Sequence, residues 1–272
     1  MPKFSANLSM LFTELPFLER FAAAADAGFT AVEFMFPYAH DVDDIAHELQ
    51  RHRLRLVLFN LPPGNWDTGD RGNAIFPDCL AQFRSGVALA ARYATSLECS
   101  QLHCLAGIVP ADGDARAYTA TYIDNLRYAA DALDKHGITL LIEPINTRDI
   151  PGYYLTSSAQ ARDVMARVDR RNLRLQYDLY HMHIMGEDAP AELTRHRDAI
   201  AHVQLADAPG RHEPGTGEID FARLLGHLDN IGFGGYVGLE YRPSTATVDS
   251  LAWLQALSRG AYDSPTGPAL SD

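Results

Sequence analysis

The sequence predicts a single (β/α)₈ barrel. Short β-rich apolar runs alternate with segments of helical periodicity along the whole chain, and eight such runs can be distinguished. Acidic or amide residues directly follow several of these runs, which is typical of parallel barrels because the carboxyl ends of their strands converge on one face. A doubly wound open sheet is the alternative that the same alternation allows.

The eight predicted strands are short, rich in β-branched residues or leucine, and bounded by turn residues. They cover residues 4–8, 31–34, 55–60, 101–105, 139–143, 174–178, 202–205 and 236–240. The predicted helices cover residues 15–28, 41–52, 87–93, 122–137, 157–168 and 220–232. Three of these helices run into a glycine, Gly28, Gly137 or Gly232, as helix C-termini commonly do.

Length and composition indicate one domain. The 272 residues are 47% hydrophobic and 21% charged, which is ordinary for a globular protein. We predict that the barrel covers residues 1–260 and that residues 261–272, rich in Ser, Pro and Gly, form a flexible tail.

Charge and cysteine content restrict the partners and the compartment. The formal net charge is −12, which disfavours binding to nucleic acid and to anionic membranes. No apolar run is long enough to span a membrane. The three cysteines, Cys79, Cys99 and Cys104, lack metal-site spacing, and the N-terminus lacks an export signal, so we expect a cytoplasmic protein.

Four oxygen-bearing side chains end four predicted strands. Glu143, Asp178, Gln204 and Glu240 follow one another at intervals of about one strand plus one helix, so a barrel would bring them together. Three carboxylates and an amide are the ligands that a hard divalent cation prefers. Glu143 and Glu240 would face each other across the barrel mouth, where one could act as a base and the other as an acid. The pattern therefore predicts an enzyme.

Other polar residues end strands or follow them closely. His181 can hydrogen-bond a substrate oxygen, and Arg211 can hold a carboxylate with two hydrogen bonds. Asn7, His103 and Glu33 are expected to line the pocket; Glu33, flanked by apolar residues, would be buried and either paired with a cation or in contact with substrate.

Two loops interrupt the regular pattern. Residues 61–77 contain Trp66 and follow the third strand, so they are placed to form a lid over the site. Residues 208–219 form a second wall, and the GTG string at 215–217 is a turn signal rather than a phosphate-binding loop. Walker A, dinucleotide-binding, HExxH and GxSxG motifs are absent from the sequence.

Several motifs resemble the hydroxypyruvate isomerase family of the xylose-isomerase-like barrel superfamily. They are FSANLSMLF, VEFMFPY, LLIEPIN with DIPGYYLT, LQYDLYHM, and EPGTGEI with VGLEYRP. The resemblance extends over residues 4–254. It implies metal ligands at Glu143, Asp178, Gln204 and Glu240, with Gln204 where the ketose epimerases of the superfamily typically have histidine. An amide oxygen there favours Mg²⁺ or Mn²⁺.

The resemblance also implies a reaction and an acid–base pair. Hydroxypyruvate would be converted to tartronate semialdehyde through an enediolate, with proton transfer by Glu143 and Glu240 and with His181 contacting the substrate. The alternatives are a 2-oxotetronate isomerase, a ketose 3-epimerase, an apurinic endonuclease, which the acidic charge disfavours, and a metal-free binding barrel. Membership of the superfamily further implies a homo-oligomer, a dimer or a tetramer.

Overall fold

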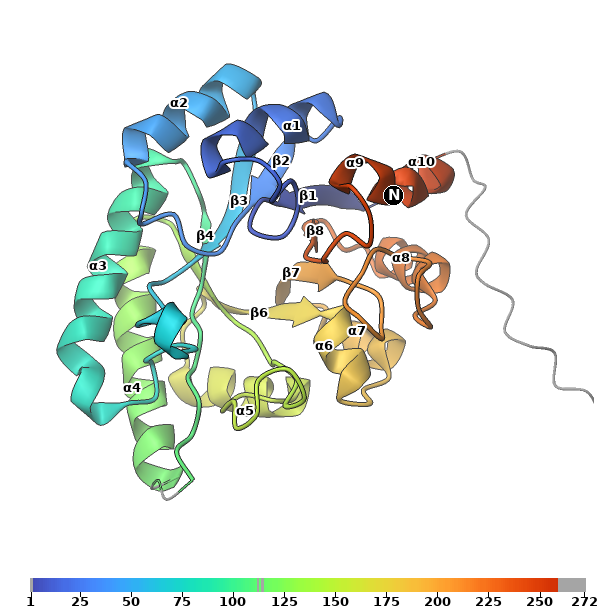
Figure 1. Ribbon diagram of the computed structural model, residues 1–272. Helices are drawn as coiled ribbons and strands as arrows, with labels where there is room; N and C mark the ends of the chain where they lie inside the picture. Colours follow the sequence, from blue (N-terminus) through green and yellow to red (C-terminus); the bar gives the residue numbers. More distant parts are fainter. Residues whose placement is uncertain (1, 112, 114, 259–272) are drawn as a thin grey trace, which may run out of the picture.

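The computed structural model describes residues 2–111, 113 and 115–258, and its eight parallel strands close into a barrel in chain order (Figure 1). The first and last strands pair directly, with Ala6 opposite Leu239, so the predicted barrel is confirmed and the open sheet is wrong. The predicted tail at residues 261–272 and the proposed domain boundary lie outside the described residues.

The strands agree with the predicted ones to within one or two residues at most ends. They are β1 (Lys3–Asn7), β2 (Ala31–Glu33), β3 (Arg55–Asn60), β4 (Gln101–His103), β5 (Thr139–Ile142), β6 (Leu173–Asp178), β7 (Ile200–Leu205) and β8 (Tyr236–Leu239). Several strands stop one or two residues before the predicted end, so Glu143 and Glu240 occupy the first loop position after β5 and β8.

The helices pack around the barrel (Figure 1). They are α1 (Arg20–Asp26), α2 (Val42–His52), α3 (Leu80–Ser96), α4 (Ala115–Asp134), α5 (Ser158–Val168), α6 (Leu179–Ile184), α7 (Ala189–His196), α8 (Phe221–Asn230), α9 (Thr247–Ser250) and α10 (Ala252–Ser258), with 3₁₀ turns η1 (Phe17–Glu19), η2 (Trp66–Thr68) and η3 (Pro77–Cys79). The sequence pattern did not predict α6, α7, α9 or α10.

Side-chain caps explain where several helices begin. Asp41, Ser157, Asp188 and Asp220 each accept a hydrogen bond from a backbone N–H of the first turn of α2, α5, α7 and α8. At the other ends, Gly28, Gly137 and Gly232 have positive φ, as the glycine signals predicted.

The strands bury apolar side chains on the helix side, and inside the barrel they carry a small apolar cluster followed by polar side chains. Because strand side chains alternate, Ala31 and Glu33 share the inner face of β2, and Leu141 and Glu143 share that of β5. Ala31, Val57 and Leu141 belong to a small apolar cluster separate from the main core. The polar residues lie beyond this cluster, toward the carboxyl ends of the strands, which places them where a barrel enzyme has its active site.

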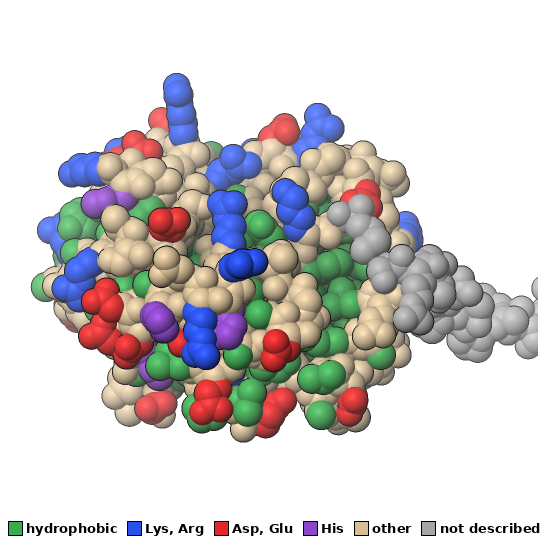
Figure 2. All heavy atoms as spheres, turned by 90° about the horizontal axis from the view of Figure 1, so that it is seen from above, with side chains coloured by type: hydrophobic (Ala, Val, Ile, Leu, Met, Phe, Trp, Pro, Cys, Tyr) green, Lys and Arg blue, Asp and Glu red, His purple; other side chains and the backbone are tan. Residues whose placement is uncertain are grey.

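The surface carries charges of both signs. On the face seen over α1, α2 and α9, acidic, basic and histidine side chains all occur (Figure 2). Within the described part of the chain, no helix combines the length and apolarity needed to cross a bilayer.

Candidate active site

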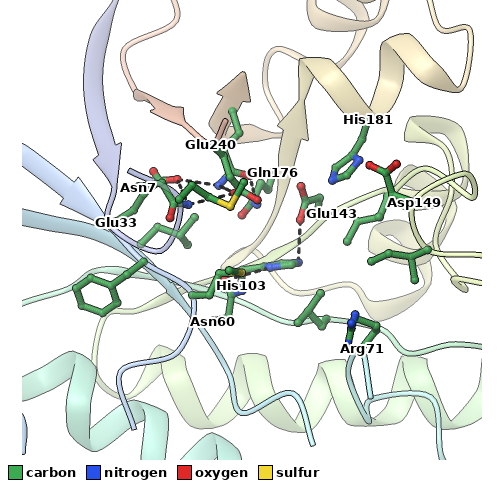
Figure 3. Close-up of a pocket in the computed structure, with 18 of the residues that line it drawn as sticks. Asn7, Glu33, Asn60, Arg71, His103, Glu143, Asp149, Gln176, His181 and Glu240 are labelled. Atoms are coloured by element: carbon green, nitrogen blue, oxygen red, sulfur yellow. Dashed lines mark hydrogen bonds and ion pairs between the residues drawn. The ribbon is translucent and has the colours of Figure 1, made fainter. Parts of the chain in front are cut away.

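A cavity of about 320 Å³ lies at the carboxyl ends of the barrel strands (Figure 3). Every residue that the sequence predicted for the site lines it except Asp178, which is fully buried beside it. The predicted residues in its wall are Asn7, Glu33, His103, Glu143, His181, Gln204, Arg211 and Glu240. Their roles remain predictions, but the strand ends and the segments that follow them bring these residues together.

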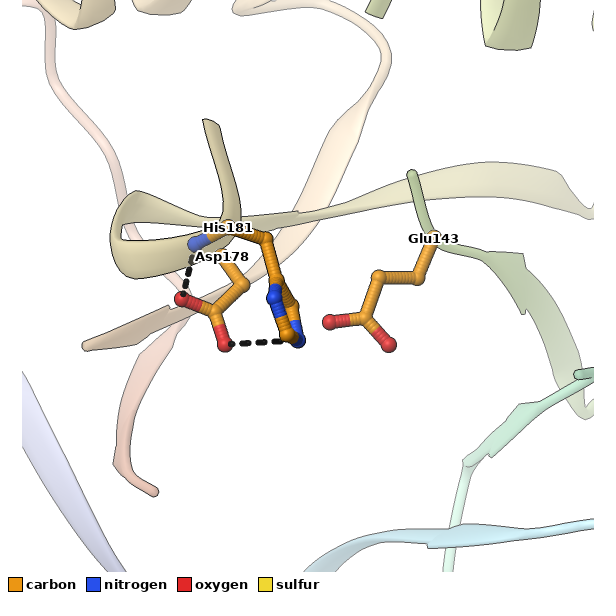
Figure 4. A group of neighbouring side chains, drawn as sticks. All are labelled: Glu143, Asp178 and His181. Carbon is orange, nitrogen blue, oxygen red and sulfur yellow. Dashed lines mark hydrogen bonds and ion pairs between the residues drawn. The ribbon is translucent and has the colours of Figure 1, made fainter. Parts of the chain in front are cut away.

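Asp178 is positioned by the helix that follows it. Its Oδ1 caps α6 by accepting hydrogen bonds from the backbone N–H groups of Tyr180 at 2.7 Å and His181 at 3.4 Å. Its Oδ2 accepts no hydrogen bond although it is buried. The first turn of α6 then places the His181 ring beside this oxygen, with Nε2 at 3.8 Å (Figure 4).

The protonation of His181 follows from its neighbour Asn146. The Asn146 Oδ1 accepts hydrogen bonds from the backbone N–H groups of Arg148 at 3.0 Å and Asp149 at 2.7 Å, so its amide nitrogen must point the other way. That nitrogen lies 2.7 Å from Nδ1 of His181, which therefore accepts. Burial, with the nearby Arg211 charge, lowers the pKa of His181 well below its usual value, so the ring is neutral and carries its proton on Nε2.

Glu143 lies between two histidines. Its Oε2 is 3.6 Å from Nε2 of His103, and its carboxylate faces His181 on the other side (Figures 3 and 4). Burial, reinforced by the negative charges of Glu240 and Asp178, raises the pKa of Glu143 well above its usual value. Burial also lowers the pKa of His103 to about 3, so both histidines are neutral hydrogen-bonding groups.

Glu240 is held from three directions. Arg211 Nη2 donates to its Oε1 at 2.6 Å, and its Oε2 accepts from Asn7 Nδ2 at 3.3 Å and from Gln204 Nε2 at close range. Burial raises the pKa of Glu240 to about 8, although the Arg211 charge opposes the shift. Arg211 also lies 3.8 Å from Asp178 Oδ2, so its guanidinium group neutralises part of the carboxylate cluster.

A buried hydrogen-bond network positions Gln204. Its Oε1 accepts from Gln176 Nε2 at 2.6 Å, and its Nε2 also donates to Glu33 at 2.8 Å. Glu33 pairs with Nε2 of His202 at 2.9 Å and accepts from Ser5 at 2.8 Å. Burial alone would raise the pKa of Glu33, but His202 and the hydrogen bonds outweigh it and lower that pKa. The partner of Glu33 inside the barrel is therefore the buried imidazole of His202.

The donor chemistry fits a divalent cation. Glu143, Asp178 and His181 are all buried, and each offers one possible ligand atom (Figure 4). These three atoms lie within 4.8 Å of one another. The Oδ2 of Asp178, which is buried and accepts no hydrogen bond, is an atom that a cation would satisfy. Because His181 carries its proton on Nε2, it suits hydrogen bonding to substrate better than metal ligation. Glu240 and Gln204 line the same cavity, where the Gln204 oxygen accepts a hydrogen bond from Gln176 and its nitrogen faces Glu240.

Both predicted loops lie at the cavity. Residues 61–77 bring Trp66 against Phe36, with ring centroids 5.0 Å apart, and both Trp66 and Arg71 line the wall. In the other loop, the Asp207 carboxylate accepts backbone N–H bonds from Ala208, Gly215, Gly217 and Ile219 at 2.8–3.1 Å. The backbone amides of Gly215 and Gly217 in the predicted GTG turn thus bind a carboxylate of the chain itself.

Sequence reasoning did not identify some residues of the site. Gln176 lies two residues before Asp178 and so shares its inward face, a period-2 signal that could have found it. Asn146 follows Glu143 by three residues in the same loop, but no sequence signal joins it to His181. Arg71 and Asp149 also line the cavity and come from loops whose path the sequence does not specify.

Comparison with known proteins supports this picture. A family described as xylose isomerase-like TIM barrel matches residues 21–257. The hydroxypyruvate isomerase of Escherichia coli strain K12 is 47% identical over 254 residues, covering 93% of this chain and 98% of that protein. The 2-oxo-tetronate isomerase of Cupriavidus necator is 44% identical over 255 residues, covering 94% and 98%.

A solved structure described as an AP endonuclease of family 2 from Brucella melitensis superposes with a TM-score of 0.92 at 47% identity. The superposition covers 94% of this chain and 98% of that structure's chain. The resemblance inferred from the motifs is therefore confirmed by relatives that extend over nearly the whole barrel. The chain belongs to the xylose isomerase-like TIM barrel family.

Proposed function

We propose that this protein is a hydroxypyruvate isomerase that interconverts hydroxypyruvate and tartronate semialdehyde. The observation that carries the proposal is that Glu143 and Glu240 line one small cavity together with the neutral donor His181. The E. coli relative, 47% identical, supplies the substrate class. A cavity of about 320 Å³ is at the small end of the range for ligand sites, which suits a three- or four-carbon acid.

The proposed reaction moves one proton between neighbouring carbons. One of the two glutamates, as carboxylate, removes a proton from C3 of hydroxypyruvate, and the C3–H electron pair forms the C2–C3 double bond of an enediolate. The other glutamate, as carboxylic acid, gives a proton to C2. The proton of the C3 hydroxyl passes to the C2 oxygen, so that C3 becomes the aldehyde and C2 carries the hydroxyl. The raised pKa values of both residues favour a pair that holds one proton between them.

His181 and the carboxylate cluster support the charge that develops. His181 lines the cavity, and its Nε2–H would donate to a substrate oxygen as that oxygen becomes negative. We propose that Glu143, Asp178, Gln204 and Glu240 hold one divalent cation, Mg²⁺ or Mn²⁺, as their oxygen-rich chemistry favours. Such a cation would supply positive charge next to the substrate oxygens. Asn7 and His103 complete the wall, while Glu33 positions Gln204.

The proposal is tested by turnover on a panel of substrates. Purified protein is stripped of metal, then assayed with and without Mg²⁺ or Mn²⁺ on hydroxypyruvate, 2-oxotetronate and neutral ketoses. The proposal predicts metal-stimulated turnover with the highest kcat/KM for hydroxypyruvate. Preference for 2-oxotetronate would favour the second candidate, to which the 44% identical Cupriavidus relative points. Turnover of ketoses alone would contradict both.

Endonuclease activity is a poorer fit to this site. A net charge of −12 opposes approach to a DNA backbone, and Trp66 and Arg71 narrow the cavity that contains the carboxylates. Cleavage of abasic-site DNA by the same metal-loaded protein, without isomerase activity, would overturn the proposal.

A further inference from the structure

Three arginines line the cavity, and a hydroxy-oxo acid carries a carboxylate that needs a cationic partner. They are Arg71, Arg211 and Arg242, which come from the loops after β3, β7 and β8. Arginine binds carboxylates best through two parallel N–H donors on one edge of its guanidinium group. The arginine that recognises the substrate should therefore have one such edge free of other hydrogen bonds. The three side chains differ in this respect.

The guanidinium group of Arg211 already binds Glu240 and lies close to Asp178. Its Nη2 donates to Glu240 Oε1 at 2.6 Å and lies 3.8 Å from Asp178, and its Nε donates to the Glu240 carbonyl oxygen at 3.4 Å. A substrate carboxylate bound there would displace Glu240 and would meet two carboxylates at close range. Arg242 is exposed at the rim, and among the residues that the structure describes its hydrogen bonds come from its backbone, which bonds Arg211 and His212.

Arg71 presents a free edge to the cavity. Its Nη1 donates to the carbonyl oxygens of Trp66 at 3.1 Å and Asp70 at 2.7 Å, and its guanidinium carbon lies 3.8 Å from the centroid of the Trp66 ring. Within the described part of the chain, Nε and Nη2 of Arg71 have no hydrogen-bond acceptor and no carboxylate partner. Those two nitrogens form the side of the guanidinium group that binds a carboxylate with two hydrogen bonds.

The loop holds this arginine in place before any ligand binds. Gly72 donates its N–H to the Pro63 carbonyl at 2.9 Å, and a Cβ on Gly72 would lie 2.3 Å from the Leu105 carbonyl oxygen. Asp70 closes the loop by accepting from the backbone N–H of Asn65 at 2.7 Å. A guanidinium group that is stacked on an indole and tied to fixed carbonyls loses little freedom on binding, which favours affinity.

The position of Arg71 leaves room for chemistry elsewhere in the cavity. In Figure 3 it lies on the opposite side from the cluster of Asn7, Glu33 and Glu240, with Glu143 between them in the view. A short acid whose carboxylate is held by Arg71 would therefore extend its C2 and C3 atoms toward the glutamates.

We propose that Arg71 binds the substrate carboxylate through Nε and Nη2 and so selects hydroxy-oxo acids over neutral sugars. This inference rests on the proposed isomerase function. It assigns the carboxylate to Arg71 instead of Arg211, whose guanidinium group balances the charge of Glu240 and Asp178.

The test compares four variants for kcat and KM on hydroxypyruvate. Arg71→Gln should raise KM about 10- to 100-fold, the value of hydrogen bonds to a charged group, with a smaller change in kcat. Arg71→Lys should recover part of the loss because it keeps the charge without the paired donors. Arg148→Gln removes an exposed charge from the neighbouring β5–α5 loop and is the matched control, with an expected change in KM below about threefold.

Arg242→Gln tests the rival residue. A rise in KM with Arg242→Gln and none with Arg71→Gln would overturn the proposal, as would equal effects of Arg71→Gln and Arg148→Gln. Thermal unfolding of each variant checks that the fold is intact. If wild-type protein turns over no acid, the isomerase proposal is wrong whatever the role of Arg71. Titration calorimetry with hydroxypyruvate then tests Arg71 separately, because equal affinity of wild type and Arg71→Gln would contradict its role in binding the carboxylate.

Discussion

Asn146 donates a hydrogen bond from Nδ2 to Nδ1 of His181 at 2.7 Å, and this bond determines which nitrogen of the buried ring carries the proton. Two backbone N–H groups fix the orientation of the Asn146 amide, so the tautomer is set by a loop that lies outside the strands. The Nε2–H of His181 is thereby available to the cavity.

Replacing Asn146 with alanine should lower kcat for hydroxypyruvate by roughly tenfold. The ring would lose the partner that fixes its tautomer, and a hydrogen bond of about 1.4 kcal/mol corresponds to tenfold in rate. Thr147→Ala is the control, since the Thr147 side chain is exposed and its hydroxyl donates a long hydrogen bond, 3.9 Å, to the sulfur of Met185. Steady-state kinetics measure both, and an unchanged kcat in Asn146→Ala would contradict the assignment.

Glu33 should matter mainly for stability. Glu33→Gln removes a buried carboxylate that lies 2.9 Å from Nε2 of His202 and accepts hydrogen bonds from Ser5 and Gln204, and loss of buried hydrogen bonds to a charged group costs about 3 kcal/mol. Urea denaturation measures the free energy of unfolding. Glu218→Gln is the comparison, because that exposed pair with His183 should contribute less than about 1 kcal/mol. Similar losses in the free energy of unfolding for the two variants would show that the buried network around Glu33 contributes little to stability.

Gly238 provides a steric test of the same network. A Cβ at this position in β8 would lie 2.3 Å from Oε1 of Glu33, so Gly238→Ala should destabilise the protein by about 1–3 kcal/mol. Gly226→Ala in α8 meets nothing within 4 Å and should be neutral or stabilising. Thermal unfolding compares the two; equal melting temperatures would mean that Glu33 is free to move away.

Stability without metal should depend on pH through Glu240. Its pKa is raised from 4.5 to about 8, so the folded protein binds a proton that the unfolded chain releases between these values. The contribution of this residue is therefore present below pH 4.5 and is lost as the pH rises to about 8, with a slope of at most about 1.4 kcal/mol per pH unit.

Urea denaturation of metal-stripped wild type and Glu240→Gln between pH 5 and 8 measures the pH-dependent contribution of Glu240 to the free energy of unfolding. The stability of the wild type should fall more steeply with pH than that of the variant, in which residue 240 cannot ionise. Parallel pH profiles for the two proteins would rule out the raised pKa.

Much of the site could be predicted because strand ends are visible in the sequence. The apolar runs before Glu143, Asp178, Gln204 and Glu240 defined where the strands stop, and closure of the barrel brings strand ends together without further information. The predicted burial of Glu33 was also correct, because apolar residues flank it on both sides.

What the sequence did not reveal depends on contacts between loops and between neighbouring strands. Gln176 contacts Gln204 only because β6 and β7 are adjacent, and Arg71 reaches the cavity only because Gly72 packs against Leu105. The six-residue helix α6 is too short for helical periodicity to be detected; Asp178, which caps it, was recognised as a candidate ligand and not as a helix start.

The most direct test of the central claim follows hydroxypyruvate by proton NMR in D₂O, with metal-stripped protein supplied with Mg²⁺ or Mn²⁺. Wild type should form tartronate semialdehyde that carries deuterium at C2, because the glutamate that donates to C2 holds a proton that has exchanged with solvent and not the proton removed from C3. Glu143→Gln and Glu240→Gln should each lower the rate by at least about a hundredfold. Undiminished turnover in either variant, or no conversion by wild type with any metal, would contradict proton transfer by this pair.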